Sequence, residues 1–183
     1  MNKIESIVLN DKKILINICD KNNIVSDVDA NIMLDNNVNA IDIIESIKLP
    51  KKPGLITLSD YDIYNYFHNS GNWRAEIFRF IGKIDFGNLK ERISNTKKMY
   101  IAVLVGLDVS LFDIYDMIES IHDGLDCEIL VMPAPDDKLN DNEIKVSVFY
   151  KDWYLFNNLI KFLKLVKVLI VLEIELHHIN VVN

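Results

Sequence analysis

Two carboxylates, Asp60 and Asp62, stand where a loop is expected to lead into a short helix. The surrounding stretch, residues 53–71, begins with Pro-Gly and ends with a glycine; we expect a loop over 55–60 and a helix over 61–69. Carboxylates are stabilised at a helix N-terminus, because unpaired amide groups and the helix dipole carry positive charge there. The pattern therefore has two interpretations: a capped helix on a surface turn, or a loop whose carboxylates take part in chemistry.

The chain lacks the side chains that would complete an active site around this loop. A phosphate-binding loop needs closely spaced glycines, so that backbone amides converge on the anion. No two of the six glycines lie within four residues of each other: Gly54, Gly71, Gly82, Gly87, Gly106 and Gly124. No Ser/His/Asp or Cys/His set is evident either, and the nearby His68 is explained as a structural histidine. The sequence thus predicts one acidic loop without a complete site.

Composition excludes several classes of partner. The 183 residues are half apolar, enough for a buried core, and the net charge of −7 with no basic stripe argues against nucleic acid. The acidic loop 136–143 is interpreted as a solvated turn. Cys19 and Cys127 lie far apart, which favours reduced thiols and gives no metal signature. The N-terminus has no signal-peptide apolar core, so we expect a cytoplasmic protein.

The longest regular pattern runs from about residue 26 to about 48. Ser26 and Asp29 resemble a capping box, and Pro50 and Pro53 would close the helix. Apolar side chains recur at near-helical spacing, at Val25, Val28, Ile32, Val38, Ile41, Ile44 and Ile47. The spacing predicts a single helix roughly 33 Å long.

The region from 73 to 150 predicts a sheet with helices. Strands are expected at 73–81, 99–105, 127–132 and 143–150, with helices at 85–95 and 111–121. One sheet with two helices packed on one face is the natural arrangement, so the predicted fold class is α+β, an α/β two-layer sandwich. Upstream, 4–9 predicts a strand, whereas 12–18 fits either a strand or one or two helical turns.

The apolar tail is harder to assign. Residues 153–163 are apolar at mixed spacing, and 166–176 are β-branched and favour a strand. Three lysines, Lys161, Lys164 and Lys167, interrupt the run, so no uninterrupted stretch approaches the roughly 20 apolar residues of a membrane span. A core or sheet-edge element and a surface-lying amphipathic segment both fit.

Five short motifs follow one another along the chain, at residues 6–12, 19–22, 55–63, 105–114 and 140–148, and together they cover about residues 4 to 150. In this order they resemble motifs in the second half of FtsZ, the bacterial relative of tubulin. On this resemblance the helix 26–48 would be the family's long central helix. The Gly-rich nucleotide-binding signature of the family's first half is absent.

The resemblance also implies a role for the acidic loop. Residues 55–63, Leu-Ile-Thr-Leu-Ser-Asp-Tyr-Asp-Ile, align without gaps on the family's synergy (T7) loop, which reaches the GTP of the neighbouring subunit and helps activate the attacking water. Asp62 keeps that loop's second carboxylate, Ser59 stands where the first is expected, and Thr57 replaces an asparagine. Because a neutral hydroxyl is a weaker proton acceptor than a carboxylate, water activation should be reduced.

The resemblance implies a truncated cell-division protein of the FtsZ GTPase family, cytoplasmic and located at the division septum. It would bind no cofactor alone, act on the GTP of a partner subunit, be inactive by itself, and polymerise with FtsZ-like subunits. The expected organisation is a remnant strand and central helix over 1–50, the FtsZ C-terminal-like domain over 51–150, and a tail over 151–183. The alternatives are a stand-alone or degenerate structural or interaction domain, and, less favoured, an independent enzyme.

Overall fold

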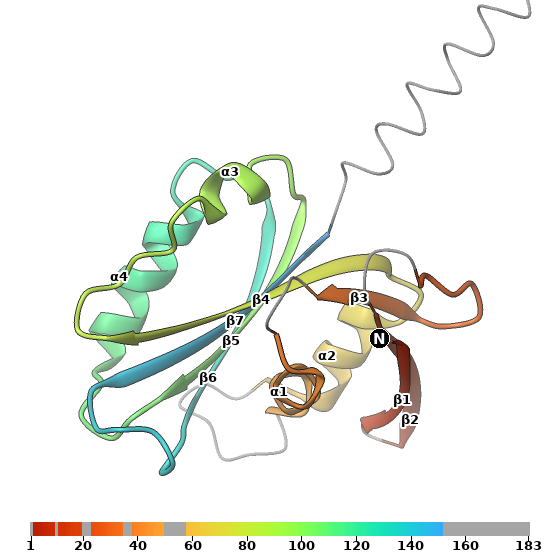
Figure 1. Cartoon of the computed structure of the whole chain (residues 1–183), viewed down its shortest axis with the longest axis horizontal. Helices are drawn as coiled ribbons and strands as arrows, with labels where there is room; N and C mark the ends of the chain where they lie inside the picture. Colours follow the sequence, from red (N-terminus) through yellow and green to blue (C-terminus); the bar gives the residue numbers. More distant parts are fainter. Residues whose placement is uncertain (1, 10, 20–22, 35–37, 50–57, 152–183) are drawn as a thin grey trace, which may run out of the picture. The chain divides into compact units, whose positions relative to one another are not determined.

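The computed structural model describes residues 2–9, 11–19, 23–34, 38–49 and 58–151 (Figure 1). These residues form one mixed seven-stranded sheet in the order β1-β2-β3-β4-β7-β5-β6. The strands are β1 Asn2–Leu9, β2 Lys12–Cys19, β3 Ala30–Leu34, β4 Gly71–Ile81, β5 Lys98–Val105, β6 Glu128–Pro135 and β7 Glu143–Lys151. The two elements predicted in the tail, over 153–163 and 166–176, lie outside the described residues.

β7 occupies the centre of the sheet, between β4 and β5 and antiparallel to both. Trp73 pairs with Lys151 on one side, and Val105 pairs with Ile144 on the other. Eight of the nine residues of β7 are buried, because helices cover both faces of the sheet there. The pairs β2–β3, β3–β4 and β5–β6 are parallel, so each needs a crossover connection rather than a tight turn.

Among the described residues, four helices cover the two faces of the sheet. α1 (Ala40–Ile47) and α2 (Asp60–Phe67) pack into one hydrophobic core, whereas α3 (Leu89–Ile93) and α4 (Leu111–His122) pack into a second core (Figure 1). The alternation of side chains along β5 separates the cores. Tyr100, Ala102 and Leu104 face the first core, and Met99, Ile101, Val103 and Val105 face the second.

Aromatic side chains fill the centre of the first core. The ring of Phe67, from α2, lies 5.1 Å from Trp73, 5.6 Å from Tyr100 and 5.8 Å from Phe149 (centroid distances). All four side chains are fully buried, and such tilted or edge-to-face pairs add roughly 0.5–1.5 kcal/mol each beyond the burial of their area. This cluster fixes α2 against the sheet.

The predicted single helix over 26–48 is wrong. The structure has the strand β3 at Ala30–Leu34 and the separate helix α1 at Ala40–Ile47. Asp29 caps no helix; instead its Oδ2 accepts a hydrogen bond from the backbone N–H of Leu15 on β2, at 2.7 Å. The apolar spacing suited a helix, but buried residues on both faces of a parallel strand give the same sequence pattern.

Polar pairing explains why the first part of this segment becomes a strand. Asn31 lies in register with Asn17 on β2 and Asn72 on β4, and the three amide side chains are joined by hydrogen bonds of 2.8 and 3.2 Å. α1 begins only at its own cap, where the side chain of Asn39 accepts a hydrogen bond from the N–H of Ile41. Tertiary pairing thus overrode the helical periodicity.

Three further expectations change with the structure. Residues 12–18, for which a strand and helical turns were both possible, form a strand. The helix expected over 85–95 is shorter, Leu89–Ile93, because Asp85 and Gly87 form a turn before it. The predicted four-stranded layer, β4-β7-β5-β6, is only part of the seven-stranded sheet. The predicted two-layer sandwich, with helices on one face, therefore describes the fold only in part. The sheet has helices on both faces, because α1 and α2 cover the face opposite α3 and α4.

Candidate functional site

The predicted site lies at the N-terminus of α2, which begins with a capping box. Ser59 is the N-cap residue, in extended conformation, and its Oγ accepts a hydrogen bond from the N–H of Asp62 at 3.2 Å. In return, Asp62 Oδ2 accepts from the N–H of Ser59 at 3.0 Å and from its Oγ at 2.7 Å. The two predicted site residues are thus in direct contact, and both are exposed.

These hydrogen bonds set the charge of Asp62. The hydroxyl of Ser59, and next its backbone N–H, hold the pKa of Asp62 below its ordinary value. Asp62 is therefore ionised at neutral pH and is a weak proton acceptor, although it provides a fixed negative charge. Both bonds from Ser59 end on Oδ2, so Oδ1 lies outside the capping box and can accept a hydrogen bond from a water or a partner.

The other residues of the predicted loop are placed differently from the expectation. Asp60, expected at the end of the loop, is the first residue of α2. Leu58, the residue just before the cap, is partly buried and packs against the first core. Thr57 lies outside the described residues, and its part in the site stays a prediction.

Buried contacts of α2 hold the capping box in place. The hydroxyl of Tyr66 lies 2.8 Å from the carbonyl oxygen of Met99 and 3.0 Å from that of Glu128, and it accepts a hydrogen bond from the N–H of Met99. Tyr66 therefore connects α2 to the first residues of both β5 and β6. Burial raises the pKa of its phenol, so it remains a neutral hydrogen-bonding group.

A lysine that the sequence did not single out also approaches α2. The ammonium group of Lys12, at the start of β2, lies 4.8 Å from the ring centroid of Tyr61 and 4.7 Å from that of Tyr64. At the other end of α2, His68 Nδ1 lies 2.6 Å from Asp29 Oδ1, and the His68 ring stacks on Tyr64. The structural interpretation of His68 fits these contacts. No spacing in the sequence brings Lys12 close to residue 61.

α4 begins with the same capping box. The Oδ2 of Asp113 accepts hydrogen bonds from the N–H of Ser110 at 3.0 Å and from its Oγ at 2.6 Å, and Ser110 Oγ accepts from the N–H of Asp113 at 3.2 Å. The hydroxyl of Ser110 likewise holds the pKa of Asp113 low. The box is therefore a structural device of this chain, and its geometry alone does not mark a catalytic site.

Gly106, before α4, is required by a close approach of the backbone. A Cβ atom at this position would lie 1.9 Å from the carbonyl oxygen of Asn140 and 2.4 Å from that of Asp141. The N–H of Gly106 donates to the carbonyl oxygen of Glu143 at 2.8 Å. The connection between β5 and α4 thus packs closely against the turn between β6 and β7 and is hydrogen-bonded to the start of β7.

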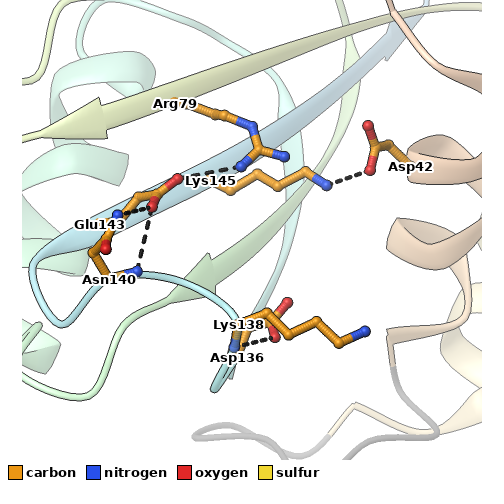
Figure 2. Close-up of polar contacts among 7 residues, drawn as sticks. All are labelled: Asp42, Arg79, Asp136, Lys138, Asn140, Glu143 and Lys145. Carbon is orange, nitrogen blue, oxygen red and sulfur yellow. Dashed lines mark hydrogen bonds and ion pairs between the residues drawn. The ribbon is translucent and has the colours of Figure 1, made fainter.

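Charged residues also tie α1 to the sheet, as Figure 2 shows. Lys145 Nζ, on β7, lies 2.6 Å from Asp42 Oδ1, on α1, and only 6% of the lysine side chain is exposed. Beside it, Glu143 accepts hydrogen bonds from Arg79 and Asn140; the bonds from Asn140, of which the backbone one has the largest effect, lower the pKa of Glu143. No local sequence pattern predicts these contacts, because the ion pair joins positions 103 residues apart.

Open hollows lie elsewhere on the surface. One of about 400 Å³ lies between α4 and β6, and one of about 380 Å³ lies beside the connection between β5 and α4. Neither is lined by Ser59 or Asp62. Over the part of the chain that the structure describes, no three His, Cys, Asp or Glu side chains are grouped to hold a metal ion, and no helix is long and apolar enough to cross a membrane.

The curled mixed sheet with helices on both faces is an FtsZ/tubulin-like fold. An empty FtsZ dimer from M. jannaschii is similar over 69% of this chain and 46% of its own, with a TM-score of 0.54 and 15% identity. A point mutant of FtsZ from the same organism matches over 68% of this chain and 47% of its own, with a TM-score of 0.53 and 16% identity.

The resemblance to FtsZ is therefore confirmed at the level of the fold. The chain spans a little under half the length of these FtsZ structures. No protein-family model matches the chain, and a search of curated proteins finds no sequence match.

Proposed function

We propose that this chain is an FtsZ-like polymer subunit fragment whose α2 N-terminus contacts the nucleotide end of a neighbouring FtsZ-like subunit. The observation that carries the proposal is the FtsZ-like fold together with an exposed, ionised Asp62 at the start of α2, where the sequence aligns with the synergy loop. The GTP belongs to the partner subunit. The chain itself has no closely spaced glycines to cradle phosphates.

In this role Asp62 would orient the attacking water through Oδ1, while Ser59 holds Oδ2. Ser59 cannot serve as a second base, because its hydroxyl already donates to Asp62 and is neutral. The fragment would therefore dock at a filament end, support GTP hydrolysis poorly and block further addition. It would modulate an FtsZ filament in the cytoplasm, at the division septum.

Co-sedimentation with a full-length FtsZ in the presence of GTP tests the docking. We expect the chain to pellet with filaments and to lower GTP turnover per subunit. Asp62→Asn should weaken co-sedimentation, whereas Asp113→Asn, which alters the identical box on α4, should not. Equal loss in both variants, or no co-sedimentation by the wild-type chain, would count against the proposal.

Restoring the missing carboxylate tests the chemistry. Ser59→Asp keeps an N-cap residue and adds a negative charge where the family has one. GTP turnover in mixed filaments should rise relative to the wild-type chain, and Ser110→Asp is the matched control. If neither variant changes turnover, the loop takes no part in hydrolysis.

The second candidate function is a structural or interaction domain without a role in GTP hydrolysis. The repeated capping box favours it, because the same Ser–Asp geometry serves an ordinary helix start at α4. This alternative predicts a folded chain that neither co-sediments with FtsZ filaments nor changes their GTP turnover.

A further inference from the structure

The two edges of the seven-stranded sheet differ in their protection against pairing. β6, at one end of the strand order, contains Pro133 and Pro135, which lack the N–H groups needed by an added strand. β1, at the other end, contains no proline. Within the described ranges β1 is bordered by a strand on one side only (Figure 1).

β1 is also long and regular. All eight of its residues pair with β2 in one continuous antiparallel register, from Asn2 opposite Cys19 to Leu9 opposite Lys12, without a bulge. Because hydrogen-bonded and non-hydrogen-bonded positions alternate, every second residue of β1 directs its backbone N–H and C=O away from β2. These groups form a row that can accept another extended strand.

The side chains of β1 favour an apolar partner. Ile7 and Leu9 are buried in the core, whereas Ile4 and Val8 project from the other face and are 55% and 50% exposed. Ser6, between these two, is exposed as well. Two apolar side chains of this size on an edge strand are what native proteins usually replace with charges.

The charges on β1 do not prevent pairing. Lys3 and Glu5 form an ion pair on the same strand, with 2.7 Å between Nζ and Oε1, so the lysine that could protect the edge is neutralised. The hairpin Asn2–Cys19 has three lysines and two acidic residues, a net charge of +1, in a chain with a net charge of −7. The edge is thus a non-acidic surface on an acidic protein.

We propose that β1 pairs antiparallel with β1 of a second copy, with Ser6 opposite Ser6 and Ile4 opposite Val8. A two-fold axis perpendicular to the sheet keeps each face continuous, so residues on the same face pair with each other. In this register both Ile4–Val8 pairs bring exposed apolar side chains together, and residues 3–9 of each strand take part. Sliding by one step toward the N-terminus places Glu5 opposite Glu5, which is unfavourable. Sliding the register by one step toward the C-terminus reduces the number of residues that the two β1 strands pair.

The paired edges form a dimer with one sheet running through both copies. The interface is small, so we expect a weak dimer with a dissociation constant in the range of about 10–100 µM. The inference goes beyond the proposed function and is independent of it, because it involves β1 and makes no use of GTP or of α2.

Sedimentation velocity on the full chain over a concentration series tests the dimer. The 21.2 kDa chain should shift toward twice its mass as concentration rises to about 100 µM. Ser6→Lys and Ser6→Asp each place like charges opposite one another and should weaken the dimer roughly fivefold. An equimolar mixture of the two variants should restore dimerisation, because opposite charges then face each other.

Ile81→Lys and Ile81→Asp are the matched controls. Ile81 is 71% exposed, at the end of β4, so these variants change the net charge equally without touching β1. A wild-type chain that remains monomeric over the whole series overturns the proposal. So does a dimer that Ser6→Lys leaves unchanged, or one that the Ile81 variants weaken as much. Circular dichroism of each variant verifies that the monomer is folded.

Discussion

The carboxylate of Asp62 accepts hydrogen bonds from both the backbone N–H and the hydroxyl of Ser59, at 3.0 and 2.7 Å. The same arrangement joins Asp113 to Ser110 at the start of α4. The chain therefore contains its own control: two capping boxes of equal geometry, of which only the one on α2 lies in the stretch that aligns with the synergy loop. Experiments that compare the two boxes separate helix capping from function.

Removing either cap should destabilise the fold by a similar amount. Ser59→Ala and Ser110→Ala each leave an N-terminal amide without its acceptor and should cost about 1 kcal/mol of unfolding free energy. Urea denaturation followed by circular dichroism measures both. A loss confined to Ser110→Ala would mean that α2 is held by its buried residues alone.

Lowering the pH should destabilise the fold, because each of the two capping boxes contains an ionised carboxylate. The pKa values of Asp62 and Asp113 are lowered in the folded chain, so each carboxylate stabilises the fold above its unfolded pKa of about 3.9. This stabilisation is lost as pH falls through the lower, folded pKa. The double variant Asp62→Asn, Asp113→Asn should therefore be less stable than wild type at neutral pH, and this difference should shrink as the pH falls below about 3.9, as urea midpoints at each pH will show. A constant difference across this range contradicts the assignment.

Gly106→Ala should be strongly destabilising. The added Cβ would meet the backbone oxygens of Asn140 and Asp141, and backbone cannot move aside cheaply. We expect a cost of about 2–3 kcal/mol, with the thermal midpoint as the measurement. Gly82→Ala is the contrasting variant, because its Cβ meets open space and the cost of about 1–2 kcal/mol comes only from the positive φ of 83°.

Breaking the ion pair between Asp42 and Lys145 from one side should cost more than replacing both residues. Asp42→Ala leaves the buried lysine ammonium without its partner, and we expect a loss of about 2–4 kcal/mol. The double variant Asp42→Ala, Lys145→Met removes the buried charge and should recover part of that loss. Denaturant unfolding of the three proteins measures the difference, and a double variant less stable than Asp42→Ala would refute it.

The isolated chain should not bind GTP. The sequence provides no glycine-rich phosphate loop, and in the proposed role the nucleotide belongs to the partner. Equilibrium binding of labelled GTP to the purified chain should show no saturation. Saturable binding would contradict this prediction, because it would require a nucleotide site without a glycine-rich loop.

Much of this fold could be predicted because its signals are local. The strand β5 is a continuous apolar run, and α4 has a capping serine followed by an apolar face at helical spacing. The start of α2 was expected from its acidic residues, although the capping box of Ser59 with Asp62 was not. The FtsZ-like fold was predicted from short motifs, each no longer than ten residues.

Only the tertiary structure decided those features of the fold that depend on contacts between residues distant in the sequence. Residues 30–34 have helix-compatible spacing, yet they form β3 because Asn17 and Asn72 lie on either side to bond Asn31. The contact of Lys145 with Asp42 joins β7 to α1, and no local pattern predicts it. The sequence by itself determined where most strands and helices form, since caps, turns and periodicity act within a few residues. Strand order, the second covered face and the exposed edge β1 required the folded chain, because pairing across a sheet depends on which distant segments meet.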